Sequence, residues 1–146
     1  MKEKRDELLE ILLVEDDDVV GRLHRFAVEN LVDNEVRIME NGKEAIDYLE
    51  NTRCANKNFL ILLDLNMPVM NGWQFLESLH EKEYTHKIFV HILTSSSYKE
   101  DYIKSQRYDR VMGYHTKPLT RTKLLEILES NGQVSEYLEK QVVKKS

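Results

Sequence analysis

The sequence lacks any apolar stretch long enough to cross a membrane. Its longest apolar runs are five or six residues, whereas a membrane-spanning helix needs about 20. Residues 1–7 are mostly Lys, Arg, Glu and Asp and contain no apolar segment. Because a secretory signal peptide requires such a segment, we expect none here, and we expect no association with a membrane.

Cysteine is almost absent from the chain. Cys54 is the only one, so no disulfide can form within the chain. Disulfide-stapled secreted folds are thereby excluded, and a reducing compartment is favoured. We therefore expect a soluble protein of the cytoplasm.

An excess of positive charge is also missing. The 21 Lys and Arg residues are outnumbered by 26 Asp and Glu residues, which gives a net charge of -5. A general attraction to the phosphates of nucleic acids is therefore not expected. Neither GxxxxGK[ST] nor GxGxxG occurs, so the sequence also gives no sign of a nucleotide-binding loop.

The chain has the length and composition of one globular domain. Its 146 residues are 41% hydrophobic and 32% charged, which suffices for a sizeable core. No repeat, low-complexity tract or linker divides it. We expect a charged segment over residues 1–7, a domain over 8–130, and an extension over 131–146. The extension has a weak helical pattern and is too short to be an output domain.

Strand patterns alternate with helical patterns along the whole chain. Short apolar runs indicate strands near residues 10–14, 35–39, 59–63, 88–93 and 111–115. Such continuous runs are typical of parallel strands buried on both faces. Five successive βα units predict a doubly wound α/β fold, flavodoxin-like, with helices on both faces of the sheet. The usual strand order for five strands is 2-1-3-4-5.

The segments between the strands carry helical spacing and start signals. The apolar positions expected to face the core are 19, 20, 23, 26 and 27 in the first helix, Ala45, Ile46 and Leu49 in the second, Trp73, Leu76 and Leu79 in the third, and Leu124, Leu125 and Leu128 in the fifth. The residues expected to begin helices are Asp17 or Asp18, Asn41, Asn71, one of Ser95, Ser96 and Ser97, and Thr120.

Acidic residues follow two of the predicted strands directly. The first strand leads into Glu15 and Asp16, and the third leads into Asp64. Strands 1 and 3 are neighbours in the predicted order, and open α/β sheets place their sites at the carboxyl ends of strands. The three carboxylates should therefore converge. They would repel one another unless a cation joined them, so we expect a divalent metal ion.

Two further polar residues follow later strands. Thr94 ends the fourth, and Lys117, with Pro118 after it, follows the fifth. The carboxyl ends of parallel strands meet at one edge of the sheet, so both side chains should join the acidic group. Residues separated by about a hundred positions would then form one pocket.

Four segments carry these residues in a recognisable order. They are Leu12-Leu13-Val14-Glu15-Asp16-Asp17, the run Leu62-Leu63-Asp64-Leu65-Asn66-Met67-Pro68-Val69-Met70-Asn71-Gly72, Leu93-Thr94-Ser95-Ser96, and Gly113-Tyr114-His115-Thr116-Lys117-Pro118. With all five signature positions filled, the chain resembles the receiver domain of two-component response regulators. The resemblance covers roughly residues 8–130.

The resemblance implies a role for each acidic residue. Asp64 would accept a phosphoryl group from a phosphohistidine on a sensor histidine kinase or a histidine phosphotransfer protein. Mg²⁺ would be bound directly by Asp16 and Asp64. Glu15 would reach it through a water molecule, and Asn66 through its backbone carbonyl.

The resemblance also implies a switch. Lys117 and Thr94 would contact phosphoryl oxygens, and Tyr114 would swing inward when Thr94 moves onto the phosphate. This shift would change the surface of the fourth helix, fifth strand and fifth helix, about residues 98–128, which a downstream protein or a second copy would bind. Such a domain assists its own phosphorylation and dephosphorylation but is not an enzyme acting on a separate substrate.

A second class of function begins with the same chemistry. Haloacid-dehalogenase-like phosphatases also form an aspartyl phosphate on a similar fold. They need a second Asp two residues after the nucleophile, and Asn66 stands there. The sequence therefore favours a phosphoacceptor switch over a phosphatase.

The five histidines, at 24, 80, 86, 91 and 115, lack metal-ligand spacing. We expect them to be surface or packing residues rather than zinc ligands. His91 is unusual because it lies inside the predicted fourth strand, where the apolar pattern gives no reason for an imidazole.

Overall fold

The computed structural model describes residues 7–84 and 86–139 of the chain. The strands are β1 (Leu8–Val14), β2 (Val36–Met39), β3 (Lys57–Leu63), β4 (Ile88–Thr94) and β5 (Val111–Thr116). The helices are α1 (Asp18–Glu29), α2 (Gly42–Asn51), α3 (Gly72–His80), α4 (Lys99–Ser105), α5 (Arg121–Glu129) and α6 (Gly132–Tyr137). Among these described residues, no helix combines the length and the apolar character that crossing a membrane demands.

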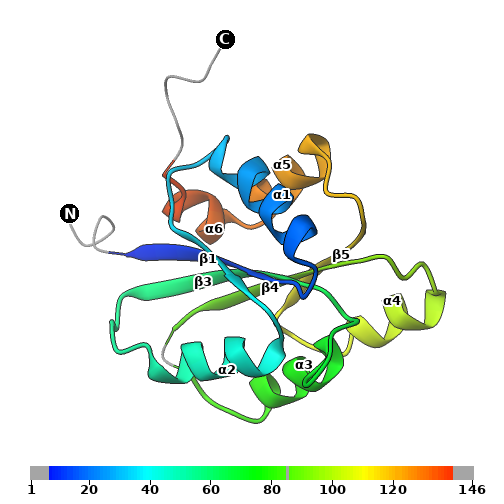
Figure 1. The fold of residues 1–146 in the computed structure, drawn as a ribbon. Coiled ribbons are helices and arrows are strands. Elements are labelled where there is room, and N and C mark those ends of the chain that lie inside the picture. The colour runs from blue at the N-terminus through cyan, green and yellow to red at the C-terminus, as the bar shows by residue number, and fades with distance from the viewer. Residues whose placement is uncertain (1–6, 85, 140–146) are drawn as a thin grey trace.

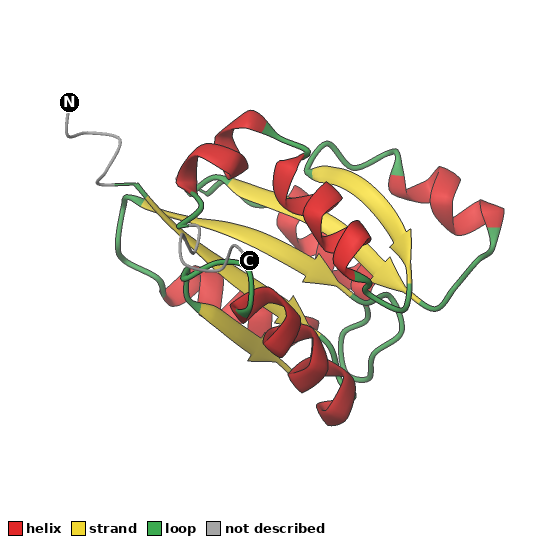
Figure 2. Cartoon of the chain, turned by 90° about the horizontal axis from the view of Figure 1, so that it is seen from above, coloured by secondary structure: helices red, strands yellow, loops and turns green. Residues whose placement is uncertain are grey.

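The five strands form one parallel sheet in the order β2-β1-β3-β4-β5, which confirms the predicted topology. All five strands run in the same direction (Figure 2). Their carboxyl ends therefore lie along one edge of the sheet. The order places β1 beside β3 at the point where the winding direction reverses.

Helices cover both faces of this sheet (Figure 1). One face carries α1, α5 and α6, and the other carries α2 and α3. α4 lies beside α3, where the ammonium of Lys104 sits 4.5 Å from the ring centre of Trp73. Because both faces are covered, the three inner strands β1, β3 and β4 contribute buried side chains to two cores. Leu12 and Ile61 belong to the core under α2 and α3, and Leu13 belongs to the core under α1 and α5.

The predicted apolar stripe of α1 was wrong at three of its five positions. The helix exposes three of its large apolar side chains, Val19, Leu23 and Phe26, by 60%, 62% and 67%. Its buried residues are Gly21, His24 and Val28, with Val20 and Ala27 half-buried. The helix is therefore rotated relative to the hydrophobic pattern.

A close approach between α1 and β2 explains this rotation. A Cβ atom at Gly21 would lie 3.3 Å from a side-chain carbon of Ile38, so the helix touches the sheet where it has no side chain. Asp17 fixes where the helix begins, because its carboxylate accepts hydrogen bonds from the amides of Val19 and Val20. An N-cap role for Asp17 was one of the two predicted possibilities.

The predicted start of α4 was also wrong. None of the three serines at 95–97 is its N-cap, because the helix begins after Tyr98, which makes no capping hydrogen bond through its side chain. The hydroxyl of Ser96 instead accepts from the amide of Tyr98 over 3.3 Å and donates to Asp101 over 2.5 Å. The serine therefore braces the loop before the helix.

The helices α2, α3 and α5 begin as predicted. Asn41, Asn71 and Thr120 each accept a hydrogen bond from the third amide of their helix. The predicted core positions of α2 are all buried. In α5, Leu125 is only half-buried, and Ile127 packs in the core together with Leu124 and Leu128.

Residues 131–139 pack against the amino end of the sheet. Val134 of α6 is fully buried. The side-chain amide of Asn34 donates to the carbonyl oxygens of Leu9 and Tyr137, and its oxygen accepts from the amide of Glu139 over 2.7 Å. The predicted extension is thus helical over α6, while residues 140–146 lie outside the described residues.

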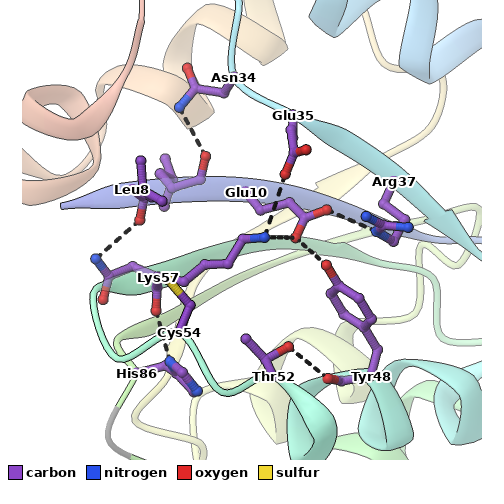
Figure 3. A network of polar contacts seen from close by, with 12 residues as sticks. Leu8, Glu10, Asn34, Glu35, Arg37, Tyr48, Thr52, Cys54, Lys57 and His86 are labelled. Carbon is purple, nitrogen blue, oxygen red and sulfur yellow. Dashed lines mark hydrogen bonds and ion pairs between the residues drawn. The ribbon is translucent and has the colours of Figure 1, made fainter. Parts of the chain in front are cut away.

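A buried carboxylate ties the amino ends of three strands together (Figure 3). Glu10 of β1 is 1% exposed. It accepts hydrogen bonds from the hydroxyl of Tyr48 at 2.5 Å and from Arg37 at 2.9 Å, and Lys57 lies 3.1 Å away. Burial favours the neutral acid, but these three donors outweigh it and lower the pKa of Glu10. The charge is therefore paired, as a buried charge must be.

Candidate functional site

Three acidic side chains converge where β1 and β3 end. Glu15 and Asp16 follow β1, and Asp64 follows β3, whose last residue pairs with the last residue of β1. One carboxylate oxygen from each of the three lies within 4.8 Å of the others. Glu15 and Asp64 are each 5% exposed, and Asp16 is exposed. The predicted proximity of these three residues is confirmed.

Backbone hydrogen bonds fix the positions of the two buried acids. The amide of Asp64 donates to the carbonyl of Val14, and the amide of Glu15 donates to that of Met39. These bonds continue the sheet ladder beyond the strands. Both carboxylates are therefore held by the rigid sheet rather than by a loop.

Gly72 allows α3 to begin against the backbone of Asp64. A Cβ atom at Gly72 would lie 2.6 Å from the carbonyl oxygen of Asp64 and 2.8 Å from Cα of Leu65. No real side chain fits at such distances. In the sequence, Asn71-Gly72 signalled only a helix start, so this contact with the acidic residue was missed.

Lys117 brings a positive charge into the acidic group. Its Nζ donates to Oε1 of Glu15 over 2.7 Å and lies 3.5 Å from Oδ2 of Asp64. Its own amide donates to the carbonyl of Thr94 over 2.8 Å, and the Lys117–Pro118 peptide bond is cis. Burial lowers the pKa of Lys117, but the contacts with Glu15 and Asp64 raise it by more, so the ammonium stays charged.

Asp64 remains short of positive charge even with Lys117 beside it. Burial raises the pKa of Asp64 most, and the negative charge of Glu15 raises it further. The ammonium of Lys117 and the amide of Asn66, 3.4 Å from Oδ1, lower it without cancelling the rise. The carboxylates thus carry more negative charge than one ammonium offsets.

This donor set fits a hard divalent cation. All the ligand atoms of the group are carboxylate oxygens, which are the donors that Mg²⁺ prefers. In the part of the chain that the structure describes, the one group of three or more acidic, histidine or cysteine side chains that could hold a metal contains no histidine. The residues therefore match the predicted Mg²⁺ better than zinc.

The loop after β4 connects Thr94 with Tyr114. Thr94 is fully buried, and its hydroxyl oxygen accepts from the amide of Ser96 over 3.3 Å. The hydroxyl of Tyr114 donates to the carbonyl oxygen of Ser96 over 3.1 Å. The ring of Tyr114 also packs edge-on against Tyr102 of α4. The loop thus joins the end of β4 to the middle of β5 and to α4.

Comparison with known protein families assigns the chain to one of them. The family model for the response regulator receiver domain matches residues 11–129. The chain belongs to this family.

This receiver domain is similar to several known response regulators over most of its length. It is 35% identical over 123 residues to Two-component response regulator 24 of Arabidopsis thaliana, covering 82% of this chain and 81% of the relative. It is 32% identical over 126 residues to Response regulator Rcp1 of Synechocystis, covering 82% and 83%. A crystal structure of a two component response regulator from Cytophaga hutchinsonii matches with a TM-score of 0.72 and 26% identity, over 85% of this chain and 96% of that one.

Two residues near the site of this receiver gave no signal in the sequence. Val69, in the loop between Asp64 and α3, has a φ of 65° and is 78% exposed. A left-handed backbone at a β-branched residue costs about 1–3 kcal/mol and is often found at functional sites. The pKa of His24 in α1 is lowered to about 4, mainly by burial and also by the charge of Lys117, with Asp64 acting in the opposite direction.

Proposed function

We propose that this receiver accepts a phosphoryl group on Asp64 from a phosphohistidine of a sensor kinase or a histidine phosphotransfer protein. The observation that carries the proposal is the convergence of Glu15, Asp16, Asp64 and Lys117 at one edge of the sheet. A carboxylate oxygen of Asp64 forms a bond to phosphorus while the donor's P–N bond breaks. The electron pair of that bond passes to the imidazole nitrogen.

Glu15, Asp16 and Asp64 would hold the Mg²⁺ ion, with the backbone carbonyl of Asn66 as a further ligand. The ion, when bound, supplies positive charge to the phosphoryl oxygens. The sheet holds the carboxylates in place before the reaction, so little reorganisation is needed.

Lys117 and Thr94 would bind the other phosphoryl oxygens. The ammonium of Lys117 already lies between Glu15 and Asp64, so a short movement brings it onto a phosphoryl oxygen of Asp64. The hydroxyl of Thr94, while accepting from Ser96, can donate its own proton to another. Both groups neutralise charge without a covalent step.

Thr94 and Tyr114 would form the switch. Both contact Ser96, so a movement of Thr94 toward the phosphate shifts the loop to which Tyr114 is hydrogen-bonded. The shift would reach α4, which exposes Tyr102 and Ile103 by about half. We propose that a downstream protein or a second copy of the chain binds this surface of α4, β5 and α5, and that output needs no contact with nucleic acid.

The exposed side of α1 would receive the phosphodonor. α1 begins two residues after Asp16, and Val19, Leu23 and Phe26 lie exposed along it. A protein that delivers a phosphoryl group to Asp64 must sit beside this helix. An apolar strip at such a place suits a protein that binds briefly during transfer. We further propose a cytoplasmic location, in keeping with the free thiol of Cys54.

The phosphatase alternative has less support. Asn66, two residues after Asp64, is exposed and carries an amide that cannot act as a general acid or base. A phosphatase would release phosphate continuously from added p-nitrophenyl phosphate. We expect no such turnover.

Intact-mass spectrometry tests the proposal directly. With Mg²⁺ and acetyl phosphate, the mass should rise by one phosphoryl group, and Asp64→Asn should abolish the gain. Asp18→Asn is the matched control, because Asp18 is exposed on the same edge and its carboxylate pairs with Arg22. An unchanged wild-type mass, or a full gain in Asp64→Asn, would contradict the assignment.

A further inference from the structure

A pair of histidines lies inside the sheet, outside the acidic site. His91 of β4 is 1% exposed. Its Nδ1 lies 3.1 Å from Nε2 of His115 in β5, and the two rings stack with their centres 5.3 Å apart. On its other side, Nε2 of His91 lies 3.3 Å from the hydroxyl of Ser130, the C-cap of α5.

The hydrogen bonds of Ser130 settle which nitrogens carry protons. Its hydroxyl donates its single proton to the carbonyl of Ile127 over 3.0 Å, so toward His91 it can only accept. Nε2 of His91 is therefore the protonated nitrogen. Burial, and to a smaller extent the neighbouring His115, lower the pKa of His91 to about 4, so the ring is neutral at pH 7. Its Nδ1 must then accept from Nε2–H of His115.

Gly113 leaves the space for this pair. A Cβ atom at Gly113 would lie 2.9 Å from both facing nitrogens, Nδ1 of His91 and Nε2 of His115. Any side chain at this position would push the two rings apart. The hydrogen bond between the two histidines therefore depends on the absence of a side chain at Gly113.

The pair lies next to an irregularity in the sheet. Val90 pairs with Val111, but His91 pairs with Gly113, so β5 holds one extra residue between these two pairings. Such a bulge leaves the register of the rest of the strand to be fixed by other contacts. A slip by one residue would turn every later side chain of β5 to the opposite face.

Register decides where Lys117 points. Beyond the bulge, Thr116 pairs with Thr94, and the amide of Lys117 donates to the carbonyl of Thr94. Lys117 follows β5 directly and its amide extends the pairing with β4, so the register that places His115 also places Lys117. A contact that holds His115 therefore also holds Lys117.

We propose that His91 and His115 are positioning residues for phosphoryl transfer. Their hydrogen bond, supported by Ser130, fixes the register of β5 beyond the bulge and so places Lys117 against Asp64. This inference rests on the proposed function, since it concerns how Lys117 reaches the phosphoacceptor.

The test separates positioning from simple loss of stability. The rate of phosphorylation by acetyl phosphate and the Mg²⁺ affinity by calorimetry are measured for wild type, His115→Leu and Gly113→Ala. Both variants should lose about tenfold to a hundredfold in the maximal rate. Mg²⁺ binding should not weaken, because its ligands follow β1 and β3 rather than β5. If the variants lost Mg²⁺ affinity together with phosphorylation rate, the proposal would be overturned.

Two conservative variants complete the series. His115→Gln retains an N–H donor and should recover most of the rate lost in His115→Leu. Gly132→Ala is the matched glycine control, because a Cβ atom there meets nothing within 4 Å, and it should match wild type. A wild-type rate in His115→Leu would overturn the proposal, as would a rate in His115→Gln as low as that of His115→Leu.

Nuclear magnetic resonance of the histidine ring nitrogens tests the hydrogen bonds of His91 independently of whether Asp64 is phosphorylated. If wild type gained no phosphoryl group, the proposed function would fail. The spectrum would still show whether the hydrogen bonds from Ser130 through His91 to His115 exist as inferred. Protonated Nε2 and bare Nδ1 in His91 at pH 7 are expected, and the opposite tautomer would overturn the chain.

Discussion

The ammonium of Lys117 donates a hydrogen bond to Glu15 over 2.7 Å, although 102 positions separate the two residues in the sequence. The contact joins the ends of β1 and β5, which lie apart in the sheet order. Without a bound metal, the lysine is the cation that offsets the buried acids. Lysine and Mg²⁺ therefore act on the same excess of negative charge.

Replacing Lys117 should make the fold depend more on Mg²⁺. In Lys117→Ala the buried carboxylates of Glu15 and Asp64 lose their partner, which should cost roughly 3 kcal/mol of stability in metal-free buffer. Saturating Mg²⁺ should then raise the melting temperature by more than in wild type. Thermal unfolding with and without Mg²⁺ measures this. Lys99→Ala, an exposed lysine of α4, is the control, and equal increments in Lys117→Ala and wild type would contradict the prediction.

The exposed strip on α1 should matter for protein donors only. Phe26→Ala should slow phosphoryl transfer from a histidine phosphotransfer protein by about tenfold, which corresponds to about 1.4 kcal/mol. Phosphorylation by acetyl phosphate should be unchanged, because that donor needs no docking surface. Ile103→Ala removes a similarly exposed apolar side chain from α4 and should leave both rates unchanged. Equal slowing with both donors would contradict the assignment.

Removing the hydroxyl of Tyr114 should weaken the switch but not the chemistry. Tyr114→Phe loses the hydrogen bond to the carbonyl of Ser96, at a cost of about 1 kcal/mol. Phosphorylation should proceed at the wild-type rate. Beryllofluoride, a mimic of the phosphoryl group, should shift fewer α4 amide resonances than in wild type. Tyr108→Phe, which loses a hydrogen bond to Glu77, is the control. If beryllofluoride shifted as many α4 resonances in Tyr114→Phe as in wild type, the prediction would be contradicted.

The network around Glu10 should make stability fall in acid. The pKa of Glu10 is lowered from 4.5 in the folded state, so the unfolded chain binds a proton at a higher pH than the folded chain does. The stability that the ionised carboxylate contributes is therefore complete well above pH 4.5 and is lost as the pH falls through the folded-state pKa.

Glu10→Gln should be less stable than wild type at pH 7 and lose less stability between pH 5 and pH 3. Urea unfolding at a series of pH values measures both effects. Glu100→Gln, an exposed acid of α4, is the control for general charge effects. A pH dependence in Glu10→Gln equal to that of wild type would rule out this carboxylate as the source.

The features that depend on topology could be predicted from the sequence. Alternating strand and helix patterns predict the βα order, and β2-β1-β3-β4-β5 is the usual order for five strands in a doubly wound sheet. Once β1 and β3 are neighbours, Glu15, Asp16 and Asp64 must meet. These predictions needed no knowledge of how individual side chains pack.

The features that depend on close packing could not be predicted. Hydrophobic periodicity assigned Leu23 and Phe26 to the core because it scores apolar character. The buried face of α1 is instead set by Gly21, which lets the helix approach, and by His24. Val69 gives no sequence sign of its left-handed backbone, since that conformation is disfavoured for valine.

His91 shows the same limit for polar residues. An imidazole inside an apolar strand has a physical explanation only when its partners are known. Those partners, His115 and Ser130, lie 24 and 39 positions away. The bulge in β5 that brings His115 opposite has no pattern in the sequence, because one extra residue in a strand leaves the alternation nearly unchanged.

The attachment of α6 matters for anyone building chimeras from this receiver. The family match stops at residue 129, which suggests a natural splice point there. Cutting at that point would remove Val134 from its buried seat and take away two of the hydrogen-bond partners of Asn34, in Tyr137 and Glu139. A fusion that keeps the chain through residue 139 retains these contacts and should therefore be more stable than one cut at residue 129.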